Sequence, residues 1–323
     1  MEKMVVSGAI NWDYNLFVER FPEPGEEVPV VRFEQVPGGK GANASVSAAF
    51  FLGRGKVAFL GALGDDEVGD RQIGVLEDAG VVTSGVKRAP GVPSGQAYIT
   101  IEASGQNTIT TVFGANLKLS PEDLAEQPRR RLITTADCVA VTDPPLPTVT
   151  RLASLAKDGK AKVVWDLATH SQRPIDELAE TLSHVDYLVM NEVEAKLLAG
   201  SQDPKQVREC AARYNPEISV VVKLGAKGSR YASAEDGLFV PGIPLDEFGL
   251  RVANTTGSGD AFMGGFASAL AAGKDVTGAL VQGSAAGAAK ATLTQTRLTG
   301  DRDRLDTLVA DLGKAIAERM RPL

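Results

Sequence analysis

The chain has 323 residues, 43% of them hydrophobic, and 34 basic against 41 acidic side chains give it a net charge of −7. This length can bury a large core, and the acidic balance argues against a basic surface that binds nucleic acid nonspecifically. No window is apolar enough to span a bilayer and no secretion signal begins the chain, so we expect no association with a membrane.

Apolar, β-rich runs alternate with helical patterns along the chain. These runs contain Val, Ile and Leu with few polar interruptions, and they lie at residues 4–10, 56–63, 138–142, 162–166, 185–190 and 218–224. Such runs are typical of parallel strands that are buried on both faces and covered by helices. We therefore predict an α/β fold with a three-layer, doubly wound, mostly parallel sheet, in a single domain that spans residues 1–323.

Two stretches interrupt this alternation and predict a small β-sheet. One covers residues 26–35, and the other is a hairpin of residues 96–101 and 107–113 joined by the turn ASGQ at 103–106. The inserted segments run from about 12 to 37 and from about 92 to 115. Composition alone assigns this sheet no role, because surface hairpins without one are the commoner case.

Residues 254–260 (NTTGSGD) lead directly into a small-residue helical stretch at 261–270. The amides of Gly257, Ser258 and Gly259 can converge at the positive end of the helix dipole, where they would stabilise a transferred phosphoryl group. Asp260 would then stand beside this anion hole as a proton acceptor. The alternative is purely structural: the glycines permit a tight turn and Asp260 caps the helix.

A second glycine-rich turn, residues 37–43 (PGGKGAN), precedes a helical stretch at 44–53. Gly38 and Gly39 would let backbone amides approach a polyol, while Lys40 and Asn43 offer hydrogen-bond donors and an acceptor to hydroxyl groups. The alternative is a solvated loop with a surface lysine. Two such turns, far apart in the sequence, favour one shared pocket.

These two turns resemble the signatures of the ribokinase-like (PfkB) carbohydrate kinases, and their residues are most similar to those of the ribokinase branch of this family. The resemblance continues, in order, through further segments at 7–13, 61–69, 114–121, 191–194 and 222–228. Other nucleotide-binding and catalytic patterns are missing, including the P-loop, the dinucleotide-binding GxGxxG after the first strand, the protein-kinase set and the hydrolase elbow.

The resemblance implies an ATP-dependent kinase that phosphorylates a hydroxymethyl group of a small sugar, such as the pentose ribose. It makes Asp260 the general base and the amides of Gly257, Ser258 and Gly259 the anion hole. It implies that Asn191 and Glu194 lie near the nucleotide phosphates, with Glu194 reaching Mg²⁺ through water. The sugar contacts that it implies are Asn11, Asp13, Gly39, Lys40, Asn43 and Asp143, and the further nucleotide contacts are Lys223, Gly225, Gly228 and Ser284.

The resemblance also implies that the small sheet forms a lid over the sugar and a contact between two copies of the chain in a homodimer. Only two cysteines (Cys138 and Cys210) and two histidines are present, so neither a disulfide framework nor a cysteine or histidine metal site is supported. The cytosol is therefore the expected compartment.

The sequence departs from the family pattern at several points. Asn254 stands where an Asp commonly helps to bind an activating monovalent cation, and residues 292–297 lack the usual Gly-Ala pair near the cation loop, so activation by potassium is doubtful. Asp143 replaces a longer Glu that is directed at the sugar, and residues 166–170 (DLATH) differ from the usual Asn-Pro wording. Together with the bulky Trp12, these changes leave the acceptor sugar open.

Structural and functional alternatives stay open as well. Asn191 can be a helix cap, and Asp13 an ordinary turn residue. The runner-up function is a nucleoside kinase of the same family, whose base would stack on aromatic side chains of the lid region: Trp12, Tyr14, Phe33 and Tyr98. A third possibility is a sugar-binding protein that keeps the fold without catalysis.

Overall fold

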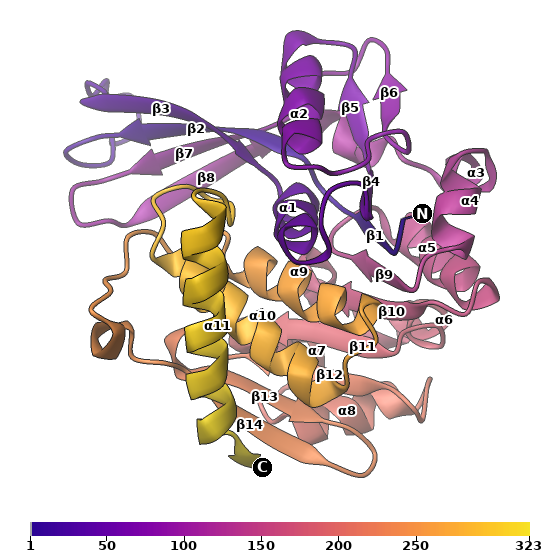
Figure 1. Cartoon of the computed structure of the whole chain (residues 1–323). Coiled ribbons are helices and arrows are strands. Elements are labelled where there is room, and N and C mark those ends of the chain that lie inside the picture. The colour runs from indigo at the N-terminus through magenta and orange to yellow at the C-terminus, as the bar shows by residue number, and fades with distance from the viewer. Residues whose placement is uncertain (1) are drawn as a thin grey trace.

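The computed structural model describes residues 2–323 and is built on a nine-stranded sheet (Figure 1). Its strand order is β15-β14-β13-β12-β11-β10-β9-β1-β4. The six strands from β12 to β4 are parallel: β1 (Met4–Ser7), β4 (Val57–Leu60), β9 (Cys138–Val141), β10 (Lys162–Asp166), β11 (Tyr187–Asn191) and β12 (Ser219–Lys223). The predicted α/β fold with a mostly parallel sheet is confirmed.

Three antiparallel strands extend one edge of this sheet: β13 (Gly228–Ala232), β14 (Gly237–Pro241) and β15 (Arg321–Pro322). At the other end β1 lies between β4 and β9, and its register aligns Met4 with both Val57 and Cys138. The chain thus winds in two directions from β1. In doubly wound sheets, ligands bind beyond the carboxyl ends of the strands at such a switch point.

Helices cover both faces of the sheet, which gives the three predicted layers. Along β1, Met4 and Val6 belong to one buried cluster and Val5 to the other, because successive side chains of a strand point to opposite faces. The first face carries α1 (Lys40–Leu52), α9 (Ser258–Ala271), α10 (Val276–Ala291) and α11 (Arg302–Arg319). The second carries α3 (Pro121–Ala125), α4 (Arg129–Thr134), α5 (Leu146–Asp158), α6 (Ala179–Leu182), α7 (Glu192–Ala199) and α8 (Pro204–Ala212).

The helices that follow the two glycine-rich turns, α1 and α9, pack directly against each other. A Cβ on Gly264 would overlap the carbonyl oxygen of Ala44, so the two backbones approach as closely as only glycine permits. The Ser47 hydroxyl donates a hydrogen bond to the Ala261 carbonyl at 3.0 Å within this buried contact. The two turns are therefore joined through the core of the protein.

A second, four-stranded sheet projects to one side of the main body (Figure 1). Its order is β3-β2-β7-β8, from β3 (Arg32–Gly38), β2 (Asn11–Phe17), β7 (Gly95–Ile101) and β8 (Asn107–Val112). The predicted hairpin is present as β7 and β8. We call this sheet the lid. A short helix, α2 (Glu67–Asp78), and the strand pair β5 (Ala62–Gly64) and β6 (Lys87–Ala89) lie beside it.

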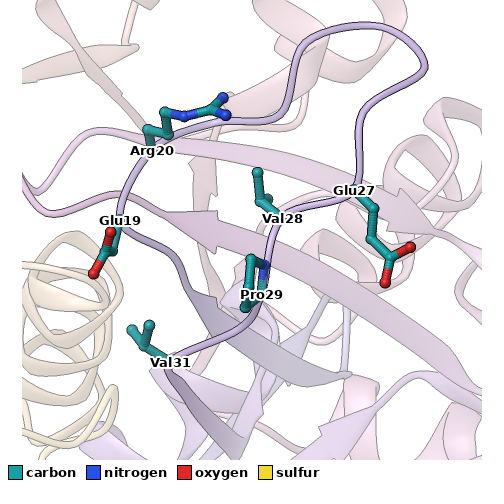
Figure 2. Close-up of a pocket in the computed structure, with 6 residues that line it drawn as sticks. All are labelled: Glu19, Arg20, Glu27, Val28, Pro29 and Val31. Carbon is teal, nitrogen blue, oxygen red and sulfur yellow. The ribbon is translucent and has the colours of Figure 1, made fainter.

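The strand predicted at 26–35 is displaced, because it begins at Arg32 and continues to Gly38. Pro22, Pro24 and Pro29 precede it, and proline cannot donate to a strand ladder, so residues 18–31 form a loop instead. Figure 2 shows a pocket in this loop that none of the candidate site residues lines. Its lining residues are Glu19, Arg20, Glu27, Val28, Pro29 and Val31.

The remaining elements are short 3₁₀ turns, among them η4 (Gly225–Lys227) directly after β12. The others are η1 (Gly114–Leu117), η2 (Ala168–Gln172), η3 (Ile175–Leu178) and η5 (Leu245–Phe248). Across residues 2–323, no helix combines the length and the apolar character needed to cross a membrane.

Candidate active site

The turn before α9 requires glycine and directs Asp260 away from its own helix. Gly257 is the N-cap residue with φ of 82°, and a Cβ there would overlap the Thr296 carbonyl oxygen. Asp260 lies in the first turn of α9, yet its Oδ2 accepts a hydrogen bond from Asn43 Nδ2 at 2.8 Å. The two glycine-rich turns thus meet at the Asp260 carboxylate.

The environment of Asp260 favours a proton acceptor. Burial raises the pKa of Asp260 above its ordinary value of 3.8, and this effect outweighs the opposing influence of Lys40, the Asn43 hydrogen bond and Lys223. A carboxylate with a raised pKa is a stronger base than an exposed one.

The amides beside Asp260 are not equivalent. The Ser258 amide already donates to the Thr255 carbonyl at 3.1 Å, whereas no such bond engages the amides of Gly257 and Gly259 in the part of the chain described. Lys223 Nζ lies 3.7 Å from the position that a Cβ would take on Gly259, so this ammonium faces the turn. Positive charge and two unengaged amides therefore converge at the start of α9.

The Lys40 turn is pressed against the segment that follows β1. Gly39 has φ of 93°, and a Cβ there would lie 2.6 Å from the Ala9 carbonyl oxygen, while a Cβ on Gly38 would overlap the Asp13 carboxylate. Only glycines allow this approach. The turn therefore sets Lys40 and Asn43 at the start of α1, directly beside the first lid strand.

Lys40 stands among acidic groups from both halves of the site. The protein atoms that surround Lys40 act against its charged form, but the charges of Asp260, Asp166, Asp143 and Glu194 outweigh this effect and raise the pKa of Lys40 above its ordinary value. These four carboxylates come from four separate segments of the chain, which therefore converge around Lys40.

Asn11 and Asp13 alternate along β2 and so share one face of the lid. Asn11 Oδ1 accepts a hydrogen bond from Asn116 Nδ2 at 2.8 Å. Asp13 is only 8% exposed, and burial raises the pKa of Asp13 to about 7, with Arg297 lowering it and Asp260 raising it. This aspartate is a buried, titratable group close to the candidate base.

Asp143, just after β9, anchors the same region. Its Oδ1 accepts hydrogen bonds from the Ala9 amide at 2.9 Å and from the Thr142 hydroxyl at 2.6 Å. These bonds fix the segment between β1 and β2 at the switch point of the sheet.

Arg297 is a residue that the sequence analysis missed as part of the site. It is 3% exposed, and it donates from Nε to Asn43 Oδ1 at 2.9 Å and from Nη2 to the Gly38 carbonyl at 3.1 Å. The first bond fixes the Asn43 amide so that its NH₂ faces Asp260. Burial lowers the pKa of Arg297 to about 10, and the charges of Asp13 and Asp260 oppose this effect.

Asn191 and Glu194 form a capping box at the start of α7. The Glu194 amide donates to Asn191 Oδ1 at 2.9 Å, and the Asn191 amide donates to Glu194 Oε2 at 2.8 Å. The structural alternative for this pair is therefore present. Burial and Asp166 raise the pKa of Glu194, against the influence of the Asn191 amide, Lys223 and Lys40.

Asp166, noted in the sequence only as a departure, pairs with Lys223 at 2.6 Å and is 4% exposed. Register aligns Lys223 with Asn191 across neighbouring strands, so these groups share one edge of the sheet. After Lys223, Gly225 (φ 59°) and Gly228 (φ 101°) bound the 3₁₀ turn η4.

Ser284 lies in α10, where that helix packs against α9. Its hydroxyl is buried and has no hydrogen-bond partner, and the same is true of Ser258. A Cβ on the neighbouring Gly283 would lie 2.9 Å from the Phe262 carbonyl oxygen, so the two helices are in close contact here.

The acidic groups fit Mg²⁺ only in its hydrated mode. Among residues 2–323, no group of three or more His, Cys, Asp and Glu could hold a metal ion by itself. Mg²⁺ commonly keeps several waters and binds through one or two carboxylates together with substrate phosphates. Asp166 and Glu194 could serve in that way, because the charge of Asp166 acts on Glu194 and both carboxylates act on Lys40.

The aromatic side chains considered for a nucleoside base lie on the other face of the lid. Trp12 and Tyr14 alternate with Asn11 and Asp13 along β2 and so point to the opposite side. There Tyr14 stacks on Tyr98, with ring centroids 5.0 Å apart, and on Phe33 at 6.1 Å. Tyr14, Phe33 and Tyr98 thus pack with one another, on the face opposite to the one that carries Asp13.

Residues 1–301 match the family model described as pfkB family carbohydrate kinase. The chain is 32% identical over 294 residues to the ribokinase of Haemophilus influenzae, covering 90% of this chain and 92% of that protein. It is 30% identical over 281 residues to the deoxyribokinase of Salmonella typhi, covering 86% and 88%.

A solved structure of Arabidopsis thaliana ribokinase complexed with ribose and ATP superimposes with a TM-score of 0.84. It is 28% identical in sequence, and the match covers 96% of this chain and 99% of that one. The likeness therefore extends over the main sheet and the lid together.

Proposed function

The chain belongs to the pfkB family of carbohydrate kinases and is an ATP-dependent sugar kinase, and we propose that it phosphorylates a hydroxymethyl group of a small sugar, a pentose such as ribose. The observation that carries this proposal is the Asp260 carboxylate, which is held by Asn43 at 2.8 Å beside two unengaged amides and the ammonium of Lys223. The ribokinase and deoxyribokinase relatives support a pentose as the acceptor.

In the proposed reaction, Asp260 accepts the proton of the sugar hydroxyl as its oxygen attacks the γ-phosphorus. The new O–P bond forms while the bond to the β-phosphate oxygen breaks, so ADP leaves and the proton remains on Asp260. The amides of Gly257 and Gly259, with Lys40 and Lys223, stabilise the charge of the transferred group. Ser258 contributes less as a donor, since its amide is engaged with Thr255.

We further propose that the sugar lies between the lid and the Lys40 turn. Asn11, Asp13, Gly39, Lys40, Asn43 and Asp143 are the proposed contacts. Supporting this role, Asn11 and Asp13 share the lid face beside Asp260, and the Asp143 hydrogen bonds hold the adjoining segment in place. Asp143 is one methylene shorter than glutamate, so it reaches less far toward the sugar than a glutamate would.

For the nucleotide we propose the opposite side of Asp260, with Asn191, Lys223, Gly225, Gly228 and Ser284 as contacts. The unpartnered Ser284 hydroxyl supports a polar ligand there. Glu194 would hold Mg²⁺ through water, with Asp166 beside it, and the ion would neutralise charge on the phosphates. The Asn191 and Glu194 side chains already accept hydrogen bonds as a helix cap, so the ion would be held mainly by phosphate and water.

We also propose that the lid joins two copies of the chain in a homodimer. Apolar side chains are exposed on it, including Phe33 at 52% and Ile109 at 59%. Sedimentation velocity should give a dimer for the wild type and a smaller species for Phe33→Asp. A monomeric wild type at micromolar concentration would contradict the proposed assembly.

The acceptor and the base can be tested together by following ADP release with ribose, 2-deoxyribose, fructose and adenosine. We expect turnover with a pentose and a loss of about 10²-fold or more in kcat for Asp260→Asn, in the range for removal of a general base. Asp311→Asn, on the exposed side of α11, is the matched control and should change nothing.

Each alternative function predicts a different result. Turnover with adenosine and none with a pentose would favour a nucleoside kinase, although the lid aromatics offer it no support. Thermal stabilisation by sugar without stabilisation by ATP and Mg²⁺ would favour a sugar-binding protein without catalysis. An Asp260→Asn variant as active as the wild type would overturn the proposed base.

A further inference from the structure

A lysine of α10 lies fully buried beneath the turn that precedes α9. Lys290 has 0% relative exposure, and its Nζ donates a hydrogen bond to the Asn254 carbonyl oxygen at 2.7 Å. Its Cε lies 3.6 Å from the position that a Cβ would take on Gly257. The ammonium is therefore set directly behind the residues that form the proposed anion hole.

No carboxylate forms an ion pair with Lys290 within residues 2–323. Burial lowers the pKa of Lys290 to about 8, and the charge of Asp260 is the influence that opposes this effect. A buried ammonium with one carbonyl partner is destabilising unless its charge serves a purpose or is compensated nearby. The nearest source of compensation is the site that handles the phosphoryl group.

Two loop segments close around this ammonium. The amides of Ala253 and Asn254 donate to the Ala291 carbonyl at 2.8 and 3.2 Å, and Asn254 Nδ2 donates to the Thr294 carbonyl at 2.9 Å. The Thr296 carbonyl lies against Gly257. Lys290 thus sits where the 253–257 segment and the 291–296 segment meet.

The family resemblance implies a monovalent cation at this junction, but the residues present do not fit one. The carbonyl of Asn254 is already bonded to an ammonium, and a second cation there would be repelled by it. Asn254 also lacks the carboxylate that would draw a cation from solution, and its side chain bonds to Thr294 and to the Thr256 amide instead.

We propose that the Lys290 ammonium is a tethered cation that takes the place of an exchangeable monovalent ion, holding the Asn254–Gly257 turn and adding positive potential behind the anion hole. Lys290 is a positioning residue, since it acts through the turn and touches neither substrate. The proposal rests on the proposed function in so far as it assigns this turn to phosphoryl transfer.

The first test needs no variant. Wild-type activity should be the same in potassium, sodium and choline chloride at equal ionic strength, and potassium should raise its melting temperature no more than sodium does. An activation by potassium of several-fold in the wild type would overturn the proposal. The melting experiment is independent of catalysis, so it remains informative even if the acceptor sugar has been misassigned.

The second test separates charge from volume. Lys290→Met keeps most of the volume without the charge, and Lys290→Ala opens room for an ion. We expect kcat to fall by about 10- to 100-fold in both, below the loss seen on removal of a direct oxyanion donor. Potassium or ammonium should restore activity and raise the melting temperature of Lys290→Ala selectively over sodium, and should do neither for Lys290→Met.

Lys274→Met is the matched control, because Lys274 lies exposed just before α10 and its ammonium donates to Gln282 Oε1 at 2.8 Å. It should behave as the wild type in every salt. A Lys290→Met variant with wild-type kcat would show that only the volume of the side chain matters and would refute a role for the charge. If neither variant folds, the wild-type salt comparison decides.

Discussion

Asp13→Asn should make the protein more stable at neutral pH while impairing sugar binding. Burial raises the pKa of Asp13 from its ordinary value of 3.8 to about 7 in the folded protein, and the side chain is 8% exposed. Asparagine has the shape of the protonated carboxyl and does not titrate. The substitution therefore removes the cost of ionising a buried acid while keeping a polar group in the same place.

The sign of the pH dependence follows from proton uptake. Below pH 3.8 both folded and unfolded chains hold the Asp13 proton, and between pH 3.8 and about 7 only the folded chain does. Wild-type stability due to this group therefore falls as pH rises through that window. One pH unit corresponds to about 1.4 kcal/mol, so the advantage of Asp13→Asn should grow from nearly zero at pH 4 to at most about 4 kcal/mol above pH 7.

Urea unfolding of both proteins from pH 4 to pH 8 measures this difference directly. Contributions of Asp260 and Glu194, whose pKa values are also raised, largely cancel in the comparison. Asp311→Asn, at an exposed position, should show no such pH dependence. A stability difference between Asp13→Asn and the wild type that stays constant across this range would refute the reasoning.

Three further substitutions probe the turn, the buried arginine and the helix cap. Gly257→Ala should lower kcat by at least about 10²-fold, because the new Cβ would sit at a positive φ and overlap the Thr296 carbonyl. Gly273 has the same φ of 82° but open space around it, so Gly273→Ala should cost only about 1–3 kcal/mol of stability and leave kcat unchanged. Steady-state kinetics that rank the two glycines equally would contradict the role of the overlap. Arg297→Met should lower kcat and raise the KM for sugar without changing the KM for ATP, because it frees the Asn43 amide. Arg304→Met, at an exposed position, should have no effect. A change in the KM for ATP alone would contradict the proposed role of Arg297. Asn191→Ala should lower the free energy of unfolding by about 1 kcal/mol and raise the KM for ATP. Asp203→Ala, which removes the cap of α8, should lower stability only. Equal KM values for ATP in the two variants would show that Asn191 serves only as a helix cap.

The sheet was predictable where strands are buried on both faces. The run at 218–224 is centred on Val220, Val221 and Val222, which is typical of a central parallel strand, and the structure places β12 there. The antiparallel edge was not predicted because polar and turn-forming residues interrupt its apolar pattern: β13 reads GSRYA, and β14 begins with glycine and ends with proline. The displaced lid strand reflects three prolines whose effect on the ladder the hydrophobic pattern does not register.

The site was predictable in its glycine-rich turns and not in the residues that support them. The local backbone geometry requires glycine at positions 257 and 39, and these glycines can be recognised in the sequence as parts of tight turns. Arg297 donates a hydrogen bond to the Gly38 carbonyl, 259 positions away in the sequence. Nothing in the local sequence of a single arginine in a polar loop indicates such a distant partner. Lys290 was missed for a related reason: lysine is almost never fully buried, so a helical pattern assigns it to the surface.

The direct contact between α1 and α9 separates two tasks within one chain. Asn43 and Asp260 begin helices that touch through Gly264 and Ala44 in the core, whereas Asn11 and Asp13 belong to a sheet that stands outside it. Arg297 links the inner end of the lid, at Gly38, to Asn43 and so to the proton acceptor, whereas the outer parts of the lid strands make no such link. Mutations in β2 and its neighbours can retune which polyol is accepted without rebuilding the machinery of transfer, so this architecture is suited to evolving new acceptors.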